Sequence, residues 1–294
     1  MKSFIPYFMI ACSVSATFAQ QKPTSAETIQ QSLIQKKQLE EQSLVKNIPF
    51  ENIGPSVMSG RVVDLDVNPK NPSEFYVAYA SGGLWYTANN GTTFDPVMDT
   101  AETINIGDIA VDWKKHTLWV GTGENNSSRS SYAGTGVLTS DDKGKTWKNV
   151  GLTDSHHIGR ILLNPTNPDE IVIGVAGHLY SPNEERGIYK TTDGGKTWKK
   201  TLFIDKHTGI IDVAYAPNNF NVMYAAAWQR DRKAWNFTGN GIGSGIYKST
   251  DGGNSWKKIT TPQSGFVTGE GVGRIGLAVF DEETVYATVS YTHL

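Results

Sequence analysis

Between residues 49 and 288 the chain alternates short apolar runs with turns rich in Gly, Pro and Asn. Runs of about five to eight residues with apolar and polar positions alternating are typical of half-buried β-strands. Inner strands are expected at 60–67, 107–113, 159–165, 211–217 and 273–279, and second strands at 74–80, 116–122, 170–176 and 221–227. Two further strands joined by a tight turn complete each unit. The pattern therefore predicts repeated sheets of four short strands, with almost no amphipathic helix.

The turn between the third and fourth strands is repeated with little change. The pattern Ser/Thr-x-Asp-x-Gly-x-Thr/Ser-Trp occupies 140–147, 191–198 and 249–256, and an eroded copy with Asn89 and Phe94 occupies 87–94. A period of about fifty residues is typical of propeller blades and is too long for heptads or leucine-rich repeats. We therefore predict an all-β fold, a β-propeller of four-stranded blades joined by these hairpins. Four blades and the start of a fifth are expected, as a fragment of a larger propeller.

The aspartates of the repeated turn invite a catalytic interpretation. Catalytic carboxylates must converge on one point, whereas a residue repeated once per blade lies at separated, symmetry-related places. A calcium loop is also disfavoured, because each turn offers too few oxygen ligands at the usual spacing. The Asp can instead accept hydrogen bonds from turn amides while the Trp covers the hairpin. We expect a structural role for Asp142, Trp147, Asp193, Trp198, Asp251 and Trp256.

Long loops join the second and third strands of blades two, three and four, at 123–136, 177–187 and 228–245. These loops emerge on one face of a propeller, and loops on a rigid scaffold are where binding is usually found. The expected ligand-binding residues are Arg129, Tyr132, His178, Tyr180, Arg186, Trp228, Arg230, Arg232 and Trp235. Trp228 and Trp235 could stack on sugar rings or anchor a peptide, although Trp228 could equally cap the core. A solvated loop face without a ligand is the alternative.

A second group of residues opens the inner strands with charges of alternating sign. Its members are Arg61, Asp108, Arg160, Asp212 and Arg274. Inner strands surround the central channel, so these side chains are expected to meet at its mouth. Ion pairs between blades are the first interpretation and anion recognition by the arginines the second. His156 and His157 should lie at the same rim, but a histidine pair without a third ligand is weak evidence for a metal, and we expect neither a metal nor a cofactor.

Composition and the chain ends narrow the functional classes. A net charge of −2 gives no reason to expect nucleic acid as a partner. Residues 1–19 have the pattern of a signal peptide, too short for a transmembrane segment, which predicts a secreted, periplasmic or cell-surface protein. The only cysteine, Cys12, lies in this segment and could alternatively be a lipoprotein acceptor. The mature chain then has no thiol for disulfides, metal binding or catalysis.

The other boundaries follow from local patterns. Residues 20–48 form an N-terminal helical or linker segment that starts with a capping box at Thr24 and Glu27. We expect a lead-in helix that docks on the propeller or stays mobile, with a partner-binding helix as the alternative. The blades occupy 49–288, and 50–54 match the outer strand of a later blade, which suggests closure by the N-terminus. Residues 289–294 are expected to be a non-native tail.

The repeated turns, the inner strands and the motifs Ser59-Gly60-Arg61-Val62 and 81–85 resemble those of secreted bacterial BNR-repeat or Asp-box proteins. These are described as sortilin N-terminal domain-like proteins or glycosyl hydrolases, and their propellers are similar to those of xyloglucanases. Xyloglucanases carry a catalytic Asp in a Thr-Asp-Val-Gly-Gly motif at the end of the first blade's second strand. The matching stretch here, 79–83, has Ala80 at the Asp position, and the second catalytic Asp lies in a region that this chain lacks.

The resemblance and the residues together leave three hypotheses. The first is a noncatalytic propeller that binds a polysaccharide or polypeptide on its loop face. The second is a xyloglucanase-like glycoside hydrolase with a different acid pair, for which Glu124 is the best visible catalytic candidate because it leaves a strand end into the loop of blade two. The third is a structural part of a surface assembly.

Overall fold

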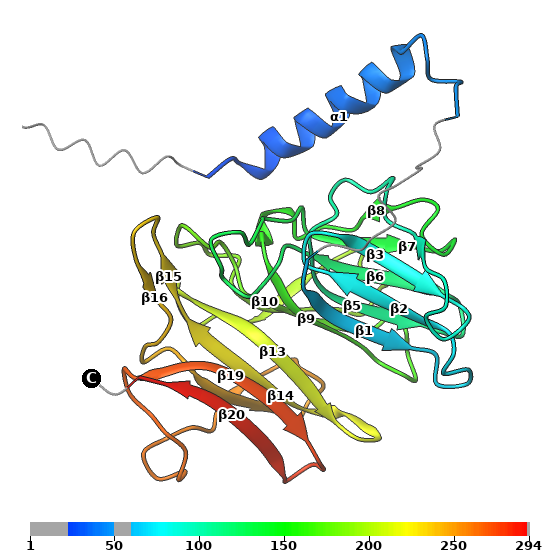
Figure 1. Ribbon diagram of the computed structural model, residues 1–294. Helices are drawn as coiled ribbons and strands as arrows, with labels where there is room; N and C mark the ends of the chain where they lie inside the picture. The colour runs from blue at the N-terminus through cyan, green and yellow to red at the C-terminus, as the bar shows by residue number, and fades with distance from the viewer. Residues whose placement is uncertain (1–22, 50–59, 293–294) are drawn as a thin grey trace, which may run out of the picture.

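The computed structural model describes residues 23–49 and 60–292, and in these ranges it contains four four-stranded antiparallel sheets (Figure 1). Within each sheet the strands are hydrogen-bonded in chain order, from the innermost to the outermost. Blade one comprises β1 (Val62–Val67), β2 (Phe75–Tyr79), β3 (Gly83–Thr87) and β4 (Asp95–Pro96), and blade two comprises β5 (Ile106–Asp112), β6 (Thr117–Thr122), β7 (Val137–Ser140) and β8 (Lys148–Asn149). Blade three comprises β9 (Ile158–Leu163), β10 (Ile171–Val175), β11 (Gly187–Thr191) and β12 (Lys199–Leu202). Blade four comprises β13 (Thr208–Ala216), β14 (Asn219–Gln229), β17 (Gly245–Ser249) and β18 (Lys257–Lys258). The predicted fold class is confirmed.

Two smaller strand pairs complete the described part. The hairpin of β15 (Asp231–Arg232) and β16 (Phe237–Thr238) is inserted in the long loop of blade four, which sequence reasoning treated as irregular. The pair β19 (Val272–Val279) and β20 (Val285–Tyr291) follows blade four and holds the start of the predicted fifth unit. Strand β20 continues to Tyr291, so it includes the first residues of the segment that was expected to be a non-native tail.

The blades are arranged around a common centre, as Figure 1 shows from cyan to red. The first strand of each sheet contacts the first strand of the next, from β1 through β5, β9 and β13 to β19. Apolar side chains fill the space between neighbouring sheets: Tyr76 and Leu84 of blade one pack with Ile106 and Leu118 of blade two in one buried cluster. Three equivalent clusters follow between the later blades. The core is therefore a series of layers between the sheets, as expected for radially repeated sheets.

A bulge near the start of each inner strand sets which side chain reaches the channel. One extra residue interrupts the register between Ile106 and Asp108, and the same irregularity occurs in β1, β9, β13 and β19. A bulge re-aims the side chain that follows it. In blade one the residue at this position is Asp64, paired with Ala78, and not Arg61, which lies before the strand. The predicted alternation of charge is therefore wrong in blade one. The pair Gly60-Arg61 resembles the Gly-Arg pairs of later inner strands, but it precedes β1 and does not occupy the same position.

The repeated turns have the same hydrogen bonds in all three complete copies. Asp193 Oδ1 accepts from Thr191 Oγ1 at 2.7 Å and from the Thr197 amide at 2.9 Å, and its Oδ2 accepts from Thr197 Oγ1 at 2.6 Å. Asp142 and Asp251 accept from the matching hydroxyls and amides. Each carboxylate thus closes its own hairpin, which supports the structural interpretation.

The tryptophans of these turns connect one blade to the one before it. Trp147 donates its Nε1–H to the Val97 carbonyl at 3.1 Å, and Trp198 donates to the Val150 carbonyl at 2.7 Å. Trp256 reaches Thr201 Oγ1 at 3.2 Å. The indole therefore does more than cover its own hairpin, because it carries a hydrogen bond across the gap between sheets.

The hairpin carboxylates should make the fold sensitive to acid. Hydrogen bonds from the hydroxyl and amide of Thr197 and from the Thr191 hydroxyl lower the pKa of Asp193 from 3.8 to about 2. A carboxyl whose pKa is lower in the folded state stabilises the fold above pH 3.8, and that contribution is lost as the pH falls toward 2. We expect Asp193→Asn to destabilise the protein at neutral pH and progressively less below about pH 4. Denaturant unfolding across this range measures it, with the exposed Asp99→Asn as control; a pH-independent difference would contradict the linkage.

The N-terminal helix α1 (Ala26–Gln42) exists as predicted, but its cap is one residue later than the capping box suggested. Ser25 is the N-cap, and its Oγ accepts from the Thr28 amide at 3.3 Å. No residue of α1 is buried, although Gln30 is 3.5 Å from Thr153 Oγ1. In the described ranges no helix has the length and apolar character needed to cross a bilayer. The predicted signal peptide at 1–19, including Cys12, and the outer-strand match at 50–54 lie outside the described residues.

Candidate binding site on the loop face

The loop of blade two, residues 123–136, lies over the inner ends of several other blades. Its Asn125 Nδ2 donates to the carbonyls of Gly107, Ile158 and Gly159, at 3.1, 3.3 and 3.2 Å. Asn126 Oδ1 accepts from Arg274 of β19 at 2.6 Å, which joins residues 148 positions apart. This loop therefore covers the mouth of the central channel, an arrangement that sequence reasoning missed. The available signal was the pair Asn125-Asn126, which begins three residues after the end of β6.

Glu124, the predicted catalytic candidate, is only 1% exposed, and both of its carboxylate oxygens are engaged. Oε1 forms an ion pair with Arg61 at 3.1 Å and accepts from the Asn126 amide at 3.1 Å, and Oε2 accepts from the Ser131 hydroxyl. Such a carboxylate fixes the start of the covering loop to blade one. A general acid needs access to the leaving group, which this arrangement does not offer.

Arg160 is the centre of the charged ring. Its Nη1 lies 3.0 Å from Asp108 Oδ1, and its Nε lies 3.1 Å from Asp212 Oδ1. Asp64 is at 3.9 Å. Burial raises the pKa of Asp108 well above its usual range, and Arg160 opposes that shift. Arg160 thus compensates three carboxylates from three blades, which supports the prediction of ion pairs between blades over anion recognition at this residue.

The carboxylates of the ring also bond to the backbone of the next inner strand. Asp64 accepts from the Ile109 amide at 3.1 Å, Asp108 from the Ile161 amide at 2.7 Å and Asp212 from the Leu277 amide at 2.9 Å. Below the covering loop a cavity of about 170 Å³ remains, lined among others by Asp108, Arg160, Asp212 and Arg274. The charged residues at the channel mouth therefore mainly connect the inner strands to one another, and the cavity left between them is small.

Two arginines that were expected on the loop surface are buried, and for them that expectation is wrong. Arg186 is 1% exposed and donates to the carbonyls of Ala176, His178, Ser181 and His207 and to Asn183 Oδ1. Arg230 is 2% exposed and donates to the carbonyls of Ala176 and Gly177 and to the Ser127 hydroxyl. The reason is that long loops carry many backbone carbonyls, and a guanidinium supplies five donors to them.

His178 and Trp228 are also buried. Trp228 donates its Nε1–H to the Gly239 carbonyl at 2.7 Å, and its ring packs in the core between blade four and β19, with Arg230 and Arg274 near its face. This position agrees with the alternative interpretation, in which Trp228 caps the core. His178 binds Ser181 Oγ through Nδ1 at 2.9 Å and lies beside Asp154.

The remaining predicted residues stay accessible. Trp235 is 81% exposed at the tip of the β15–β16 hairpin, Tyr132 is 58% exposed in the loop of blade two and Tyr180 is 42% exposed in the loop of blade three. The Tyr180 hydroxyl donates to the Arg129 carbonyl at 3.3 Å, which brings the loops of blades two and three together. Arg232 is half-buried, donates to the Ser127 carbonyl at 2.7 Å and stacks on Phe237 at 4.2 Å. Exposed aromatic rings thus stand on loops whose bases are held by buried arginines.

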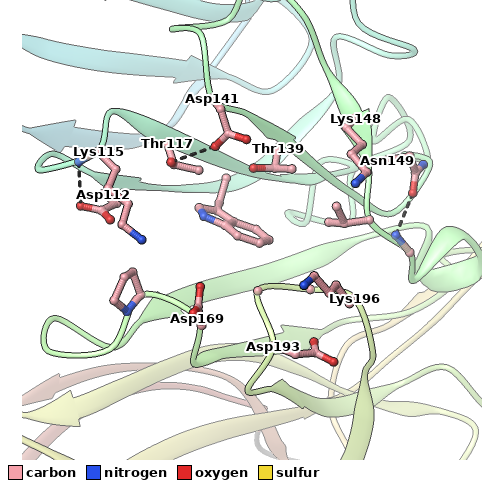
Figure 2. Close-up of a pocket in the computed structure, with 16 residues that line it drawn as sticks. Asp112, Lys115, Thr117, Thr139, Asp141, Lys148, Asn149, Asp169, Asp193 and Lys196 are labelled. Atoms are coloured by element: carbon pink, nitrogen blue, oxygen red, sulfur yellow. Dashed lines mark hydrogen bonds between the residues drawn. The ribbon is translucent and has the colours of Figure 1, made fainter.

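A larger groove of about 820 Å³ lies between blades two and three, away from these loops (Figure 2). Figure 2 shows acidic and basic side chains on both of its walls, and Trp119 also lines the groove. Thr117 donates to Asp141 at 2.9 Å on one wall, and Asp193 on the other belongs to the repeated turn. Gly195 of that turn packs directly against Trp119, where an added Cβ would lie 3.2 Å from the indole. Four aspartates and three lysines line the groove, so charges of both signs are present in nearly equal number.

Comparison with known proteins agrees with this architecture. The family model described as Sortilin-Vps10 (sortilin, neurotensin receptor 3) matches residues 135–270. A probable oligoxyloglucan-reducing end-specific xyloglucanase from Neosartorya fischeri is 28% identical over 139 residues, which are 44% of this chain and 15% of that protein. Among solved structures, an ancestral GH74 enzyme has a TM-score of 0.55 at 19% identity, with 82% of this chain and 31% of that chain covered. The Niastella koreensis GH74 enzyme has a TM-score of 0.54 at 21% identity, with 77% and 35% covered.

The radial sheets, the layered core and these structural neighbours define a β-propeller protein. Within that class, residues 135–270 are similar to the sortilin family model, and 139 residues are similar to a xyloglucanase. The chain spans about a third or less of the length of the relatives it matches.

Proposed function

We propose that the protein binds a polysaccharide on its loop face, outside the cytoplasm. The observation that carries this proposal is the set of exposed aromatic side chains, Tyr132, Tyr180 and Trp235, on the loops of three successive blades. Aromatic faces stack on the apolar faces of sugar rings, and their polar edges can bind hydroxyls. The signal-peptide pattern predicted at 1–19 supports the location.

The rigidity of the loop bases supports binding by this face. Arg186 and Arg230 hold the base of the blade-three loop through hydrogen bonds to its carbonyls, and Arg230 thereby joins the loop of blade four to it. Arg232 and Ser127 connect blade four to blade two. A pre-organised surface loses less entropy when it binds a ligand, so its contacts contribute more to affinity.

Two alternatives have specific support. A polypeptide ligand is favoured by the match to the sortilin model, because residues 135–270 include the loops of blades three and four. A hydrolase is favoured by the xyloglucanase relative. Against hydrolysis, Ala80 is 3% exposed where xyloglucanases have an Asp, and Glu124 is held by Arg61 and Ser131. The balance of these observations supports binding without hydrolysis.

The test measures binding of the full chain to xyloglucan and other plant and microbial polysaccharides by affinity electrophoresis and calorimetry. We expect Trp235→Ala and Tyr132→Ala each to weaken binding by about 5- to 30-fold, the range for loss of an aromatic contact of about 1 to 2 kcal/mol. Phe280→Ala is the matched control, because Phe280 is an equally accessible aromatic residue, 68% exposed, in the β19–β20 turn at the opposite end of the sheets. The affinity of Phe280→Ala for the polysaccharide should equal that of the unaltered protein.

The alternatives give different results in the same assays. Loop-dependent capture of unstructured peptides with no polysaccharide binding would favour the polypeptide ligand. Release of reducing ends that disappears in a folded Glu124→Gln variant would favour the hydrolase. Equal loss of affinity in Phe280→Ala and Trp235→Ala would overturn the assignment to the loop face.

A further inference from the structure

Three side chains that can bind a metal come together beside the loop face. Asp154 lies in the short 3-10 helix Thr153–Ser155, His156 follows that helix, and His178 comes from the loop between β10 and β11. One ligand atom from each lies within 4.8 Å of the others. The Nε2 atoms of His156 and His178 are 3.6 and 3.4 Å from Asp154 Oδ1. In the described residues, this is the only such group of three or more histidine, cysteine or acidic side chains.

These separations fit ligands that share one ion. Bonds of about 2.0 to 2.1 Å in a tetrahedral site place neighbouring ligand atoms about 3.3 to 3.4 Å apart. The two imidazole rings are stacked, with centroids 3.5 Å apart and planes 20° from parallel. Binding would therefore turn the His156 ring so that its lone pair points at the ion. No hydrogen bond opposes this turn at Nε2 of His156, which is buried without a hydrogen-bond partner.

We propose that Asp154, His156 and His178 bind a divalent transition-metal ion of the zinc class. Two imidazoles and one carboxylate are a ligand set that suits zinc, whereas calcium and magnesium prefer oxygen ligands alone. The Asp154 side chain is 35% exposed, so the site opens outward and leaves room for a water molecule or a ligand group as the fourth ligand. The ion would join the loop that enters blade three to the loop that leaves β10.

The surroundings already hold the ligands in place. Ser181 Oγ bonds His178 Nδ1 at 2.9 Å, and His178 Nε2 donates to the Asp154 carbonyl at 3.1 Å. Binding of the ion at Nε2 would replace this second hydrogen bond, with the ring then donating from Nδ1 to the Ser181 hydroxyl. Asn183 Oδ1 accepts from the His178 amide at 3.0 Å, which fixes the loop. His156 has a positive φ of 56°, and its carbonyl accepts from the Gly134 amide at 2.7 Å. Strained backbone held by its neighbours is frequent at functional sites.

The experiment uses the full chain without a histidine tag, stripped of metal by chelator and then dialysed. Calorimetry with Zn²⁺ and visible absorption with Co²⁺ should both give one ion per chain. The variants Asp154→Asn, His156→Gln and His178→Gln should each weaken binding by more than the roughly 10- to 100-fold typical of an outer-shell change. Ser181→Ala, a positioning change, should fall within that range. His207→Gln is the matched control, because His207 is an exposed histidine outside the group.

A second readout separates binding from folding. Free Zn²⁺ at about 100 times its dissociation constant should raise the ratio of folded to unfolded protein about 100-fold in the unaltered chain and in His207→Gln. Circular dichroism without metal shows whether each variant is folded, and Asp154→Asn is the mildest change because that side chain is partly exposed. Absence of stoichiometric binding, or binding retained by any of the three folded ligand variants, overturns the site.

Discussion

Replacing Arg160 with methionine is expected to destabilise the protein by about 3 kcal/mol, the lower end of the cost of removing one partner of a buried ion pair. Asp108 is 2% exposed and would lose its ion pair while Asp64 and Asp212 remain close by. The lower end applies because the Arg160 side chain is itself 36% exposed. Denaturant unfolding measures the change, with the exposed Arg129→Met as control.

The pH dependence of this variant gives a second check. Arg160 opposes the burial that raises the pKa of Asp108, so its removal raises that pKa further. A carboxyl with a higher pKa in the folded state binds its proton on folding, and stability then rises as the pH falls. The deficit of Arg160→Met should therefore shrink on acidification, and Asp108→Asn added to it should recover part of the lost stability. If the loss of stability in Arg160→Met changed neither on acidification nor on adding Asp108→Asn, the result would contradict the proposed ion-pair network.

Replacing Arg186 with alanine is expected to cost about 3 to 5 kcal/mol, because it removes a fully buried cation and leaves several carbonyls without donors. Burial lowers the pKa of Arg186 to about 10, so the guanidinium remains charged at neutral pH. Denaturant unfolding measures the loss, and hydrogen exchange should localise increased opening to residues 177–187.

Arg186→Lys separates charge from geometry in the same position. Lysine keeps the charge but offers three donors in place of the planar fork that reaches five acceptors, so an intermediate loss is expected. Arg129→Ala, in an exposed position, should stay within about 0.5 kcal/mol of the unaltered protein. A loss below about 1 kcal/mol for Arg186→Ala would contradict the role of this residue as the support of the loops.

The repeated parts of the fold could be predicted because local chemistry determines them. The hairpin of Asp193 closes on residues two and four positions away, so its hydrogen bonds depend only on the repeated pattern. The strands follow from the alternation of apolar residues with turns. The pairing of Arg160 with Asp108 and Asp212 could be anticipated as well, because the inner strands of a propeller surround one channel.

The loops of the candidate site could not be predicted to the same degree, because their contacts join distant residues. The burial of Arg186 and Arg230 depends on carbonyls gathered by the fold, and their charge alone predicted exposure. The sequence presents His156 beside His157, but the structure buries His157 separately and places His156 against His178. In blade one, Asp64 holds the position assigned to Arg61, because β1 begins at Val62 and the Gly-Arg pair that resembles later inner strands precedes it.

The carboxylates that pass from one inner strand to the next have a further consequence for how such a chain can change in length. The carboxylates of Asp64, Asp108 and Asp212 each accept a hydrogen bond from a backbone amide of the following inner strand. Every residue except proline carries that amide, so the receiving strand needs no matching side chain. A gene segment that encodes one repeat could therefore be duplicated or lost with this junction intact, which offers an evolutionary route to propellers of different size.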